Sequence, residues 1–144
     1  MMMIIVAKGC RKIVGGRGSG KALVTAQPIN FLAMVDPKTG VITDKKHELA
    51  GKSLKGRVLV YPNAVGSSVG AYVFYSLARN GVAPSAIACT TKAADITTAS
   101  GCAIANIPMV DMLPAGAGIK SGVSVTVDAD AGTITTAEKT AATV

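Results

Sequence analysis

The middle of the chain alternates short apolar runs with longer segments of helical spacing. Continuous apolar runs, typical of strands that are buried on both faces, occur at residues 57–61, 86–89 and 107–110. Residues 69–80 place apolar side chains at the i, i+4 spacing of a helix, and Gly81 suits the position after its last turn. A second helix is expected over residues 93–105, interrupted near Gly101. This alternation predicts a right-handed parallel βαβ unit.

Strand patterns flank this centre on both sides. Further strands are expected at residues 1–7, 22–25, 123–127 and 133–136, with tight turns at residues 36–40 and 128–132. Val41 and Ile42 then pair back as a hairpin after the first of these turns. Residues 43–55 are polar and rich in lysine, which is typical of a surface connection. We therefore predict one α/β domain over residues 1–144, with a parallel βαβ centre flanked by β-hairpins.

Composition narrows the classes of function. Aromatic residues make up 3% of the chain and Trp is absent, which disfavours modules that stack nucleic-acid bases on aromatic rings. No apolar run approaches the roughly 18 residues of a membrane-spanning helix. The apolar start of the chain also reaches Lys8 too soon for a secretory signal. We therefore expect a soluble, cytoplasmic protein with no membrane partner.

Positive charge is concentrated in the first 60 residues. This part holds eleven basic and three acidic residues, a net charge of +8, whereas the remainder holds four basic and five acidic residues, a net charge of −1. The asymmetry indicates an anionic partner: nucleic acid, a phosphorylated metabolite or an acidic protein face. A solvated surface that positive charge keeps soluble explains it equally well.

The cysteines and the histidine offer little for a metal. Cys10, Cys89 and Cys102 are odd in number and form no CxxC pair, so a reduced compartment is expected. Cys89 and Cys102 stand in stretches rich in Ala and Ile, which favours buried hydrophobic positions over ligation of an iron–sulfur cluster. His47 is the only histidine, so a site with several histidine ligands is excluded. There is also no evident Ser–His–Asp set, so any chemistry here needs groups from another polypeptide.

A glycine-rich segment, residues 15–21, matches the GxxxxGK part of a phosphate-binding P-loop. The match ends at Ala22, where a P-loop carries the Ser or Thr that binds Mg²⁺, and a strand pattern follows instead of a helix. We interpret the segment as a mobile glycine turn between two strands. Arg17 and Lys21 could contact an anion from this turn.

A second candidate site is Gly66-Ser67-Ser68, directly after a buried strand and directly before a helix. Ligands of parallel sheets bind beyond the carboxyl ends of the strands. The free backbone N–H groups and the positive end of a helix favour an anion there, or an ionised Ser67 hydroxyl. The alternative is that one serine only caps the helix. One residue suffices for a cap, however, so the Ser-Ser pair leaves a hydroxyl over.

Several ordered motifs resemble one known family. They are Val35-Asp36-Pro37-x-Thr39-Gly40, His47-x-Leu49-Ala50-Gly51-x-Ser53, Gly56-Arg57-Val58-Leu59-Val60-x-Pro62, Gly66-Ser67-Ser68-Val69-Gly70-x-Tyr72, Ala83-Pro84-x-Ala86-Ile87 and Ala103-Ile104-Ala105-x-Ile107-Pro108-Met109-Val110. Together they resemble the small subunit, or swivel domain, of the aconitase X family, over roughly residues 15–112. The resemblance implies a swivelling β/β/α domain.

The resemblance also implies a function. It implies one subunit of a hydro-lyase that dehydrates (R)-5-phosphomevalonate to trans-anhydromevalonate 5-phosphate in the archaeal mevalonate route to isoprenoids. The implied partner is a large catalytic subunit, which forms the heterodimer and holds a 4Fe–4S cluster, while this chain binds no metal. In aconitase-like enzymes the first serine of a Gly-Ser-Ser loop is the proton acceptor, and this role carries over to Ser67.

Details of substrate binding are less fixed by the resemblance. Val69 stands where aconitase has a substrate-binding arginine, and Arg17 is the candidate to take over that task. Further candidate substrate-binding residues are Gly66, Ser68 and Asn63. The chain departs from the family pattern at Ala33-Met34, where a Gly-Gly pair is usual, and at Cys89-Thr90-Thr91.

Three alternatives stay open on the sequence alone. Within the family, the substrate can be 3-hydroxyproline instead of phosphomevalonate. Outside it, the basic charge fits a nucleic-acid-binding domain, although no nucleic-acid partner is expected from the motifs. The chain can also be a purely structural subunit, in which Ser67 has no part in the reaction.

Overall fold

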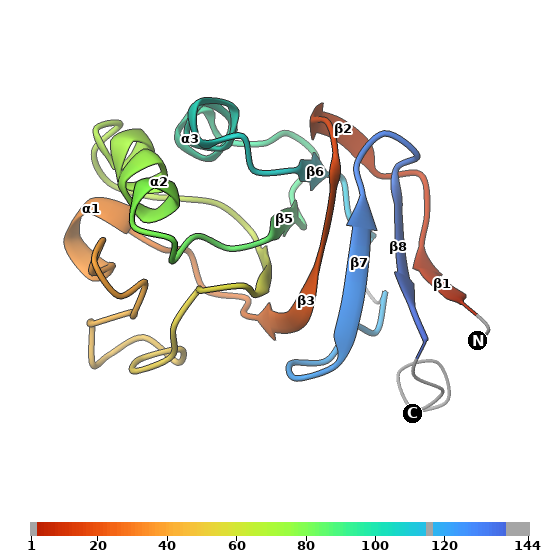
Figure 1. Ribbon diagram of the computed structural model, residues 1–144, viewed down its shortest axis with the longest axis horizontal. Coiled ribbons are helices and arrows are strands. Elements are labelled where there is room, and N and C mark those ends of the chain that lie inside the picture. The colour runs from red at the N-terminus through yellow and green to blue at the C-terminus, as the bar shows by residue number, and fades with distance from the viewer. Residues whose placement is uncertain (1–2, 115–116, 138–144) are drawn as a thin grey trace.

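The computed structural model describes residues 3–114 and 117–137, which form one mixed sheet with three helices on one side (Figure 1). The strands are β1 (Ile4–Ala7), β2 (Arg11–Val14), β3 (Arg17–Val24), β4 (Val58–Tyr61), β5 (Ala86–Cys89), β6 (Met109–Asp111), β7 (Ser124–Asp128) and β8 (Thr133–Thr136). The helices are α1 (Phe31–Met34), α2 (Gly70–Arg79) and α3 (Ile96–Ala105). None of these helices is long and apolar enough to cross a membrane.

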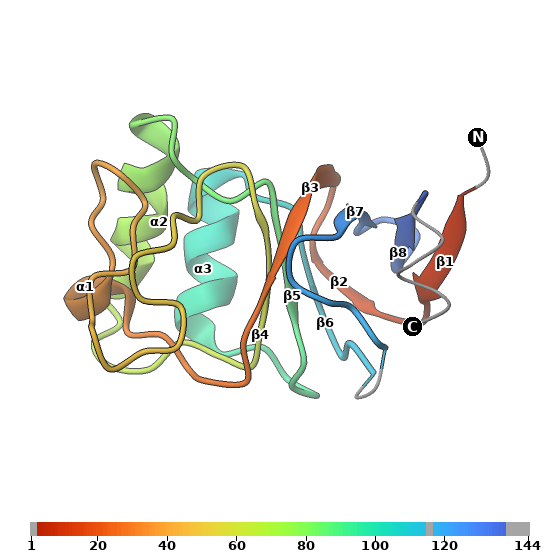
Figure 2. The same ribbon diagram turned by 90° about the horizontal axis from the view of Figure 1, so that it is seen from below.

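The sheet has the strand order β1-β8-β7-β3-β4-β5-β6-β2. Strands β3 to β6 are parallel neighbours, and all other neighbours are antiparallel. Helices α2 and α3 connect β4 to β5 and β5 to β6 and cover one face of these strands (Figure 2). The predicted βαβ unit is therefore confirmed, and α2 and strands β4 to β8 lie close to their expected positions. β3 starts five residues earlier than expected, and the sequence analysis does not predict β2. Of the strand expected over residues 1–7, residues 1–2 lie outside the described residues.

The sheet is strongly curled. β1 and β2 are its two edge strands, yet only residues 8–10 join them. Such a connection spans at most about 14 Å, so the two edges must lie near each other. The backbone N–H of Cys10 in this connection donates to the carbonyl of Gly132, between β7 and β8, at 3.1 Å. Figure 1 shows the result as a helical layer, a parallel layer and an antiparallel layer, which are the layers of the expected β/β/α domain.

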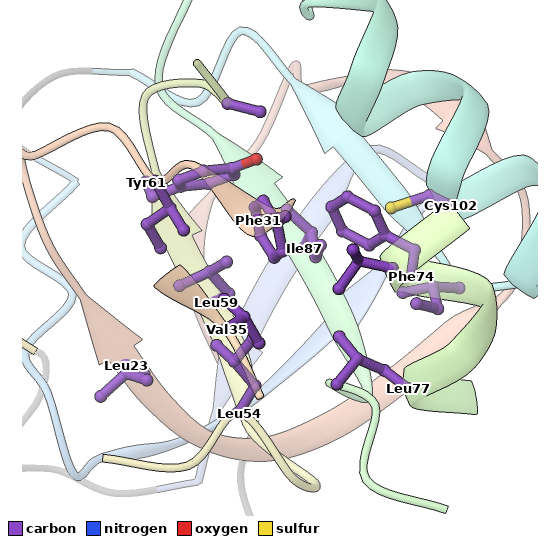
Figure 3. Packing of buried hydrophobic residues seen from close by; sticks show 14 of the residues in the cluster. Leu23, Phe31, Val35, Leu54, Leu59, Tyr61, Phe74, Leu77, Ile87 and Cys102 are labelled. Carbon is purple, nitrogen blue, oxygen red and sulfur yellow. The ribbon is translucent and has the colours of Figure 1, made fainter. Parts of the chain in front are cut away.

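Side chains of the parallel strands are buried on both faces. On β4, Leu59 and Tyr61 belong to the core between the sheet and the helices, whereas Val58 and Val60 belong to the core inside the curled sheet. Aromatic rings fill the first core, where the ring centroids of Phe31 and Phe74 lie 4.2 Å apart (Figure 3). The interior of the curled sheet is lined instead by small side chains such as Ala22, Ala86 and Ala88. Tight curling requires such small residues, because opposite walls approach closely.

The glycine-rich segment is mostly strand, so the prediction of a mobile turn over residues 15–21 is wrong beyond Gly16. A Cβ atom at Gly20 would collide with the carbonyl of Gly56, just before β4, and one at Gly18 with that of Ser85, just before β5. At Gly16 it would lie 3.3 Å from the Pro108 side chain, just before β6. β3 thus crosses the amino ends of three parallel strands, and the alternating glycines allow this close approach.

Three further expectations need correction. α3 is continuous through Gly101, which is small because a Cβ there would overlap the Phe74 ring. Residues 31–34 form the one-turn helix α1, and the expected hairpin is reduced to isolated bridges between Val35 and Ile42 and between Val41 and Ser53. The connection over residues 43–55 is not wholly on the surface. Its side chains of His47, Leu49 and Leu54 are buried.

Candidate active site

Residues 62–69, here called the serine loop, connect β4 to α2 at the carboxyl ends of the parallel strands, as expected. Gly66, Ser67 and Ser68 are all exposed. The chain then turns tightly into the helix, because the N–H groups of Gly70 and Ala71 donate to the carbonyls of Ser67 and Ser68 at 3.0 and 3.1 Å. The two hydroxyl groups therefore stand at the solvent-facing start of α2.

The two serine hydroxyls differ at the start of α2. The N-cap position is Val69, which makes no side-chain capping bond. The Ser67 hydroxyl oxygen instead accepts the N–H of Val69 at 3.1 Å, and the Ser68 hydroxyl bonds to none of the described residues. A hydrogen bond accepted by Ser67 Oγ stabilises negative charge on that oxygen.

Unpaired backbone donors surround Ser67. Within residues 3–114 and 117–137, the N–H groups of Gly66, Ser67 and Ser68 donate to no other part of the chain. The positive end of the ten-residue helix α2 lies beside them. This arrangement can bind an oxyanion or lower the cost of ionising the Ser67 hydroxyl.

The serine loop is anchored at both sides. A parallel bridge joins Ile29 to Ala64, with Val65 N–H donating to the Ile29 carbonyl at 3.0 Å and Ile29 N–H donating to the Asn63 carbonyl at 3.3 Å. On the other side, the Asp95 carboxylate accepts the N–H of Ala64 at 3.1 Å and also caps α3. These contacts fix the backbone on which Ser67 stands.

Asn30 is a site residue that the sequence did not reveal. Gly66 has a φ of +88°, and a Cβ there would collide with the side-chain amide of Asn30. The Oδ1 atom of Asn30 caps α1 by accepting the N–H of Ala33 at 3.1 Å, whereas its Nδ2 group donates to none of the described residues. An amide donor is therefore available beside the serine loop. Asn before an apolar run is a helix-start signal, but one turn of helix is too short to give a periodic pattern.

Exposed apolar side chains lie on the serine loop and on the neighbouring first turns of the helices. This apolar collar consists of Leu32, Val65, Val69, Tyr72 and Ile96, each with 42% to 78% of its surface exposed. The first turns of all three helices meet at Gly70, where a Cβ would lie 3.4 Å from Thr97 and 3.7 Å from the N atom of Leu32. A cluster of exposed apolar residues on a small domain marks a surface that another molecule covers.

The other candidate residues lie at different distances from Ser67 along the fold: one is in the serine loop and two are on β3. Asn63 lies in the serine loop, with its amide donating to the Ala64 carbonyl at 2.9 Å. Arg17 lies at the start of β3, at the amino ends of the parallel strands, where it lines a cavity of about 540 Å³ with Ser85 and Pro108. The structure therefore does not bring Arg17 to the serine loop within this chain, and Lys21 also lies on β3. The helix-start chemistry and Arg17 belong to opposite edges of the sheet.

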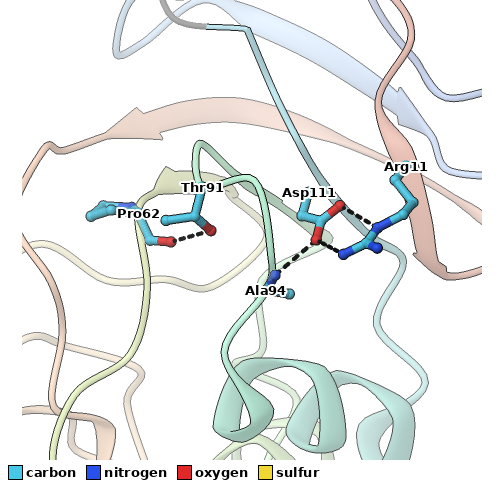
Figure 4. A network of polar contacts seen from close by, with 5 residues as sticks. All are labelled: Arg11, Pro62, Thr91, Ala94 and Asp111. Atoms are coloured by element: carbon cyan, nitrogen blue, oxygen red, sulfur yellow. Dashed lines mark hydrogen bonds and ion pairs between the residues drawn. The ribbon is translucent and has the colours of Figure 1, made fainter.

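A buried carboxylate organises the rest of the carboxyl edge (Figure 4). Asp111, at the end of β6, accepts bonds from Nε and Nη2 of Arg11 at 2.9 and 2.6 Å and from the N–H of Ala94 at 2.8 Å. The hydrogen bonds and charge of Asp111 raise the pKa of the Arg11 guanidinium. Thr91 Oγ1 adds a link to the Pro62 carbonyl at 3.2 Å. This network ties the loop after β5 to the start of the serine loop.

The described residues do not fit an iron–sulfur cluster. Cys10, Cys89 and Cys102 are all buried, and burial raises the pKa of each thiol, which opposes the thiolate form that a cluster needs. Across residues 3–114 and 117–137, no group of three or more His, Cys, Asp or Glu side chains could hold a metal ion.

Comparison with known proteins assigns the family. Residues 8–136 match the family model described as the aconitase X swivel domain. The chain belongs to this family. The resemblance seen in the sequence motifs is thereby confirmed.

Two curated aconitase X relatives carry the same name. The chain is 44% identical over 124 residues to the phosphomevalonate dehydratase small subunit of Thermococcus kodakarensis, which covers 86% of this chain and 91% of the relative. It is 49% identical over 112 residues to that of Methanosarcina acetivorans, covering 78% of this chain and 76% of the relative.

Two solved structures agree with the fold. A crystal structure of Thermococcus kodakaraensis aconitase X in its holo-form matches with a TM-score of 0.85 and 40% identity, over 96% of this chain and all of the other. A solution NMR structure of a UPF0107 protein matches with a TM-score of 0.78 and 38% identity, over 95% of this chain and all of the other.

Proposed function

We propose that this chain is the small subunit of a dehydratase that converts (R)-5-phosphomevalonate to trans-anhydromevalonate 5-phosphate, with Ser67 as the proton acceptor. The names of its relatives support the reaction class. The observation that carries the role of Ser67 is its exposed hydroxyl oxygen, which accepts the Val69 N–H among unpaired donors at the start of α2.

The proton transfer is the part of the reaction for which this chain has suitable groups. Ser67 Oγ takes a proton from the methylene next to the carbon that bears the tertiary hydroxyl. The electron pair of the broken C–H bond forms the C=C bond, and the hydroxyl leaves with its own bonding pair. The proton taken by Ser67 and the departing hydroxide combine as water, which returns the Ser67 oxygen to its ionised form. The Val69 N–H and the positive end of α2 stabilise the ionised Ser67 oxygen before the transfer. The N–H groups of Gly66 and Ser68 and the amide of Asn30 are donors for the substrate's oxygens.

The apolar collar supports a large subunit as the partner. Its residues are exposed and lie on or beside the serine loop, so a partner that covers them would also exclude water from the reaction. The relatives are named small subunits, which implies a larger partner. We assign the 4Fe–4S cluster to that partner, because the cysteines described here do not fit it.

Replacement of the hydroxyl tests the role of Ser67. In the heterodimer reconstituted with its large subunit, Ser67→Ala should lower kcat about 1000-fold, since general-base groups contribute roughly 10²–10⁴-fold. Loss of water from (R)-5-phosphomevalonate is followed by mass spectrometry. Ser76→Ala, on the same helix α2, is the matched control and should keep kcat within about threefold, in line with the small effects of surface substitutions. A fully active Ser67→Ala heterodimer that co-elutes like the wild type would rule out Ser67 as the base.

The substrate is tested separately. The same heterodimer is offered 3-hydroxyproline in place of phosphomevalonate. Turnover of phosphomevalonate alone supports the proposal. Turnover of 3-hydroxyproline alone would replace the substrate and leave the role of Ser67 to be judged by its variant.

A further inference from the structure

His47 is buried, with 7% of its surface exposed, and both of its ring nitrogens are engaged. Nδ1 accepts the backbone N–H of Leu49 at 3.0 Å, so it carries no proton. Nε2 lies 3.1 Å from the carbonyl oxygen of Pro28, which can only accept, so Nε2 is the donor. The two partners therefore fix a neutral imidazole with its proton on Nε2.

The Pro28 carbonyl lies directly before the segment that supports the serine loop. Ile29 is the residue bridged to Ala64, with backbone hydrogen bonds to Asn63 and Val65 on either side. Asn30 follows, with its amide packed against Gly66. Only Ile29 thus lies between Pro28, whose carbonyl His47 holds, and Asn30, whose side chain contacts Gly66 beside Ser67.

Two further hydrogen bonds join the segment that ends at Pro28 to the segment that holds His47. The Thr25 hydroxyl donates to the Glu48 carboxylate, and the Glu48 N–H donates to the Gln27 side-chain oxygen at 2.9 Å. These contacts hold residues 25–27, further from the serine loop. His47 is the link that reaches the residue beside Ile29 and Asn30.

We propose that His47 is a positioning residue for Ser67. Its Nε2–H holds the Pro28 carbonyl, which sets the place of Ile29 and Asn30 and so the position of the serine loop. This inference rests on the proposed role of Ser67 as the base. His47, the only histidine of the chain, would thus affect the reaction through the position of Ser67 and would not touch the reacting atoms.

Two amide variants separate the two bonds of the ring. In His47→Asn the shorter side chain keeps an acceptor for the Leu49 N–H but cannot reach Pro28. In His47→Gln the longer side chain can donate to the Pro28 carbonyl as Nε2 does. We expect His47→Asn to lower kcat of the heterodimer about 10- to 100-fold with KM changed less than about threefold, because misplacement of a reacting group by 1 Å costs about that much. His47→Gln should keep kcat within about threefold of wild type, which is rescue by the variant that retains the link.

Wild-type kcat in His47→Asn would overturn the inference. Equal losses in both variants, in step with their melting temperatures, would also overturn it, because they indicate a structural role only. Ser67→Ala is measured in parallel. If that variant is active, the proposed role of Ser67 as the base fails, whereas an active His47→Asn beside an inactive Ser67→Ala removes the positioning role of His47 alone.

A spectroscopic readout needs no variant. With only the small subunit ¹⁵N-histidine-labelled in the wild-type heterodimer, the ring nitrogens of His47 should show the neutral Nε2–H tautomer at neutral pH. An imidazolium or an Nδ1–H tautomer there would contradict the proposed link to Pro28, whether or not the His47→Asn subunit assembles.

Discussion

At the carboxyl ends of β4 and β5 the chain leaves the sheet in exposed loops and enters α2 and α3, whereas at their amino ends β3 crosses the strands at glycine residues. Both helices start at the first edge and finish at the second, where Gly81 and Asn106 follow them in left-handed conformations. Their dipoles therefore make the carboxyl edge positive and the amino edge negative. The comparison teaches that topology, rather than the number of lysines, decides which edge favours an anion.

The glycine of the serine loop offers the sharpest test of this difference. Gly66→Ala should lower kcat about 100-fold, a barrier change near 2.7 kcal/mol, because its Cβ displaces Asn30 and with it the loop that carries Ser67. Gly81→Ala, at the amino edge, is the matched control. Gly81 also has a positive φ, of 71°, but a Cβ there meets nothing within 4 Å.

In both glycine variants the left-handed alanine lowers the free energy of unfolding by about 1–2 kcal/mol. Urea denaturation should therefore show a larger loss of stability for Gly66→Ala, whose Cβ also displaces Asn30, and kinetics of the folded heterodimers tests whether that displacement reaches Ser67. Equal kcat values for the two variants would show that the contact between Gly66 and Asn30 is irrelevant to the reaction.

The buried carboxylate at the carboxyl edge should matter for stability. Asp111→Asn should lower the free energy of unfolding by roughly 2 kcal/mol, because it weakens two charge-assisted bonds from Arg11 and one from Ala94. Asp130→Asn, in an exposed pair with Lys12 at 3.5 Å, should change it by less than about 0.5 kcal/mol. Urea denaturation of the two variants measures these changes. Equal losses of unfolding free energy would contradict the stabilising role given to Asp111.

The smallest effect is expected at the amino edge. Arg17→Ala should leave kcat/KM within about threefold of wild type, because Arg17 lies at the edge of the sheet opposite the serine loop. Its side chain is 68% exposed and forms a loose ion pair with Asp128 at 3.8 Å, so stability should also change little. Kinetics of the heterodimer at several substrate concentrations checks this. A rise in KM beyond tenfold would restore Arg17 as a substrate-binding residue.

The sequence predicts the elements whose pattern is local. Strands β4 and β5 show as continuous apolar runs because both of their faces are covered, and α2 shows as an i, i+4 stripe. The serine loop follows from its place between such a strand and such a helix. These features depend on residues within one or two turns of each other.

The features that the sequence does not reveal depend on contacts between residues that lie far apart in the chain. A glycine-rich sequence is compatible with a turn or with a strand. At β3 the strand becomes evident only in the structure, where Gly20 and Gly18 lie against the backbone carbonyls of Gly56 and Ser85. Arg11 and Asp111 are 100 positions apart, so no local pattern joins them. His47 reads as part of a polar connection because its burial depends on a contact with the Pro28 carbonyl.

The closure of the curled sheet has a consequence for biosynthesis. β1 precedes the other described strands in the chain, and among the described residues it pairs with β8 alone, with Ile4 opposite Thr136. During translation β1 therefore stays without this partner until nearly the whole described chain has emerged from the ribosome. Such late, long-range pairing slows folding and exposes an open strand edge to other nascent chains, which is a situation that chaperones handle.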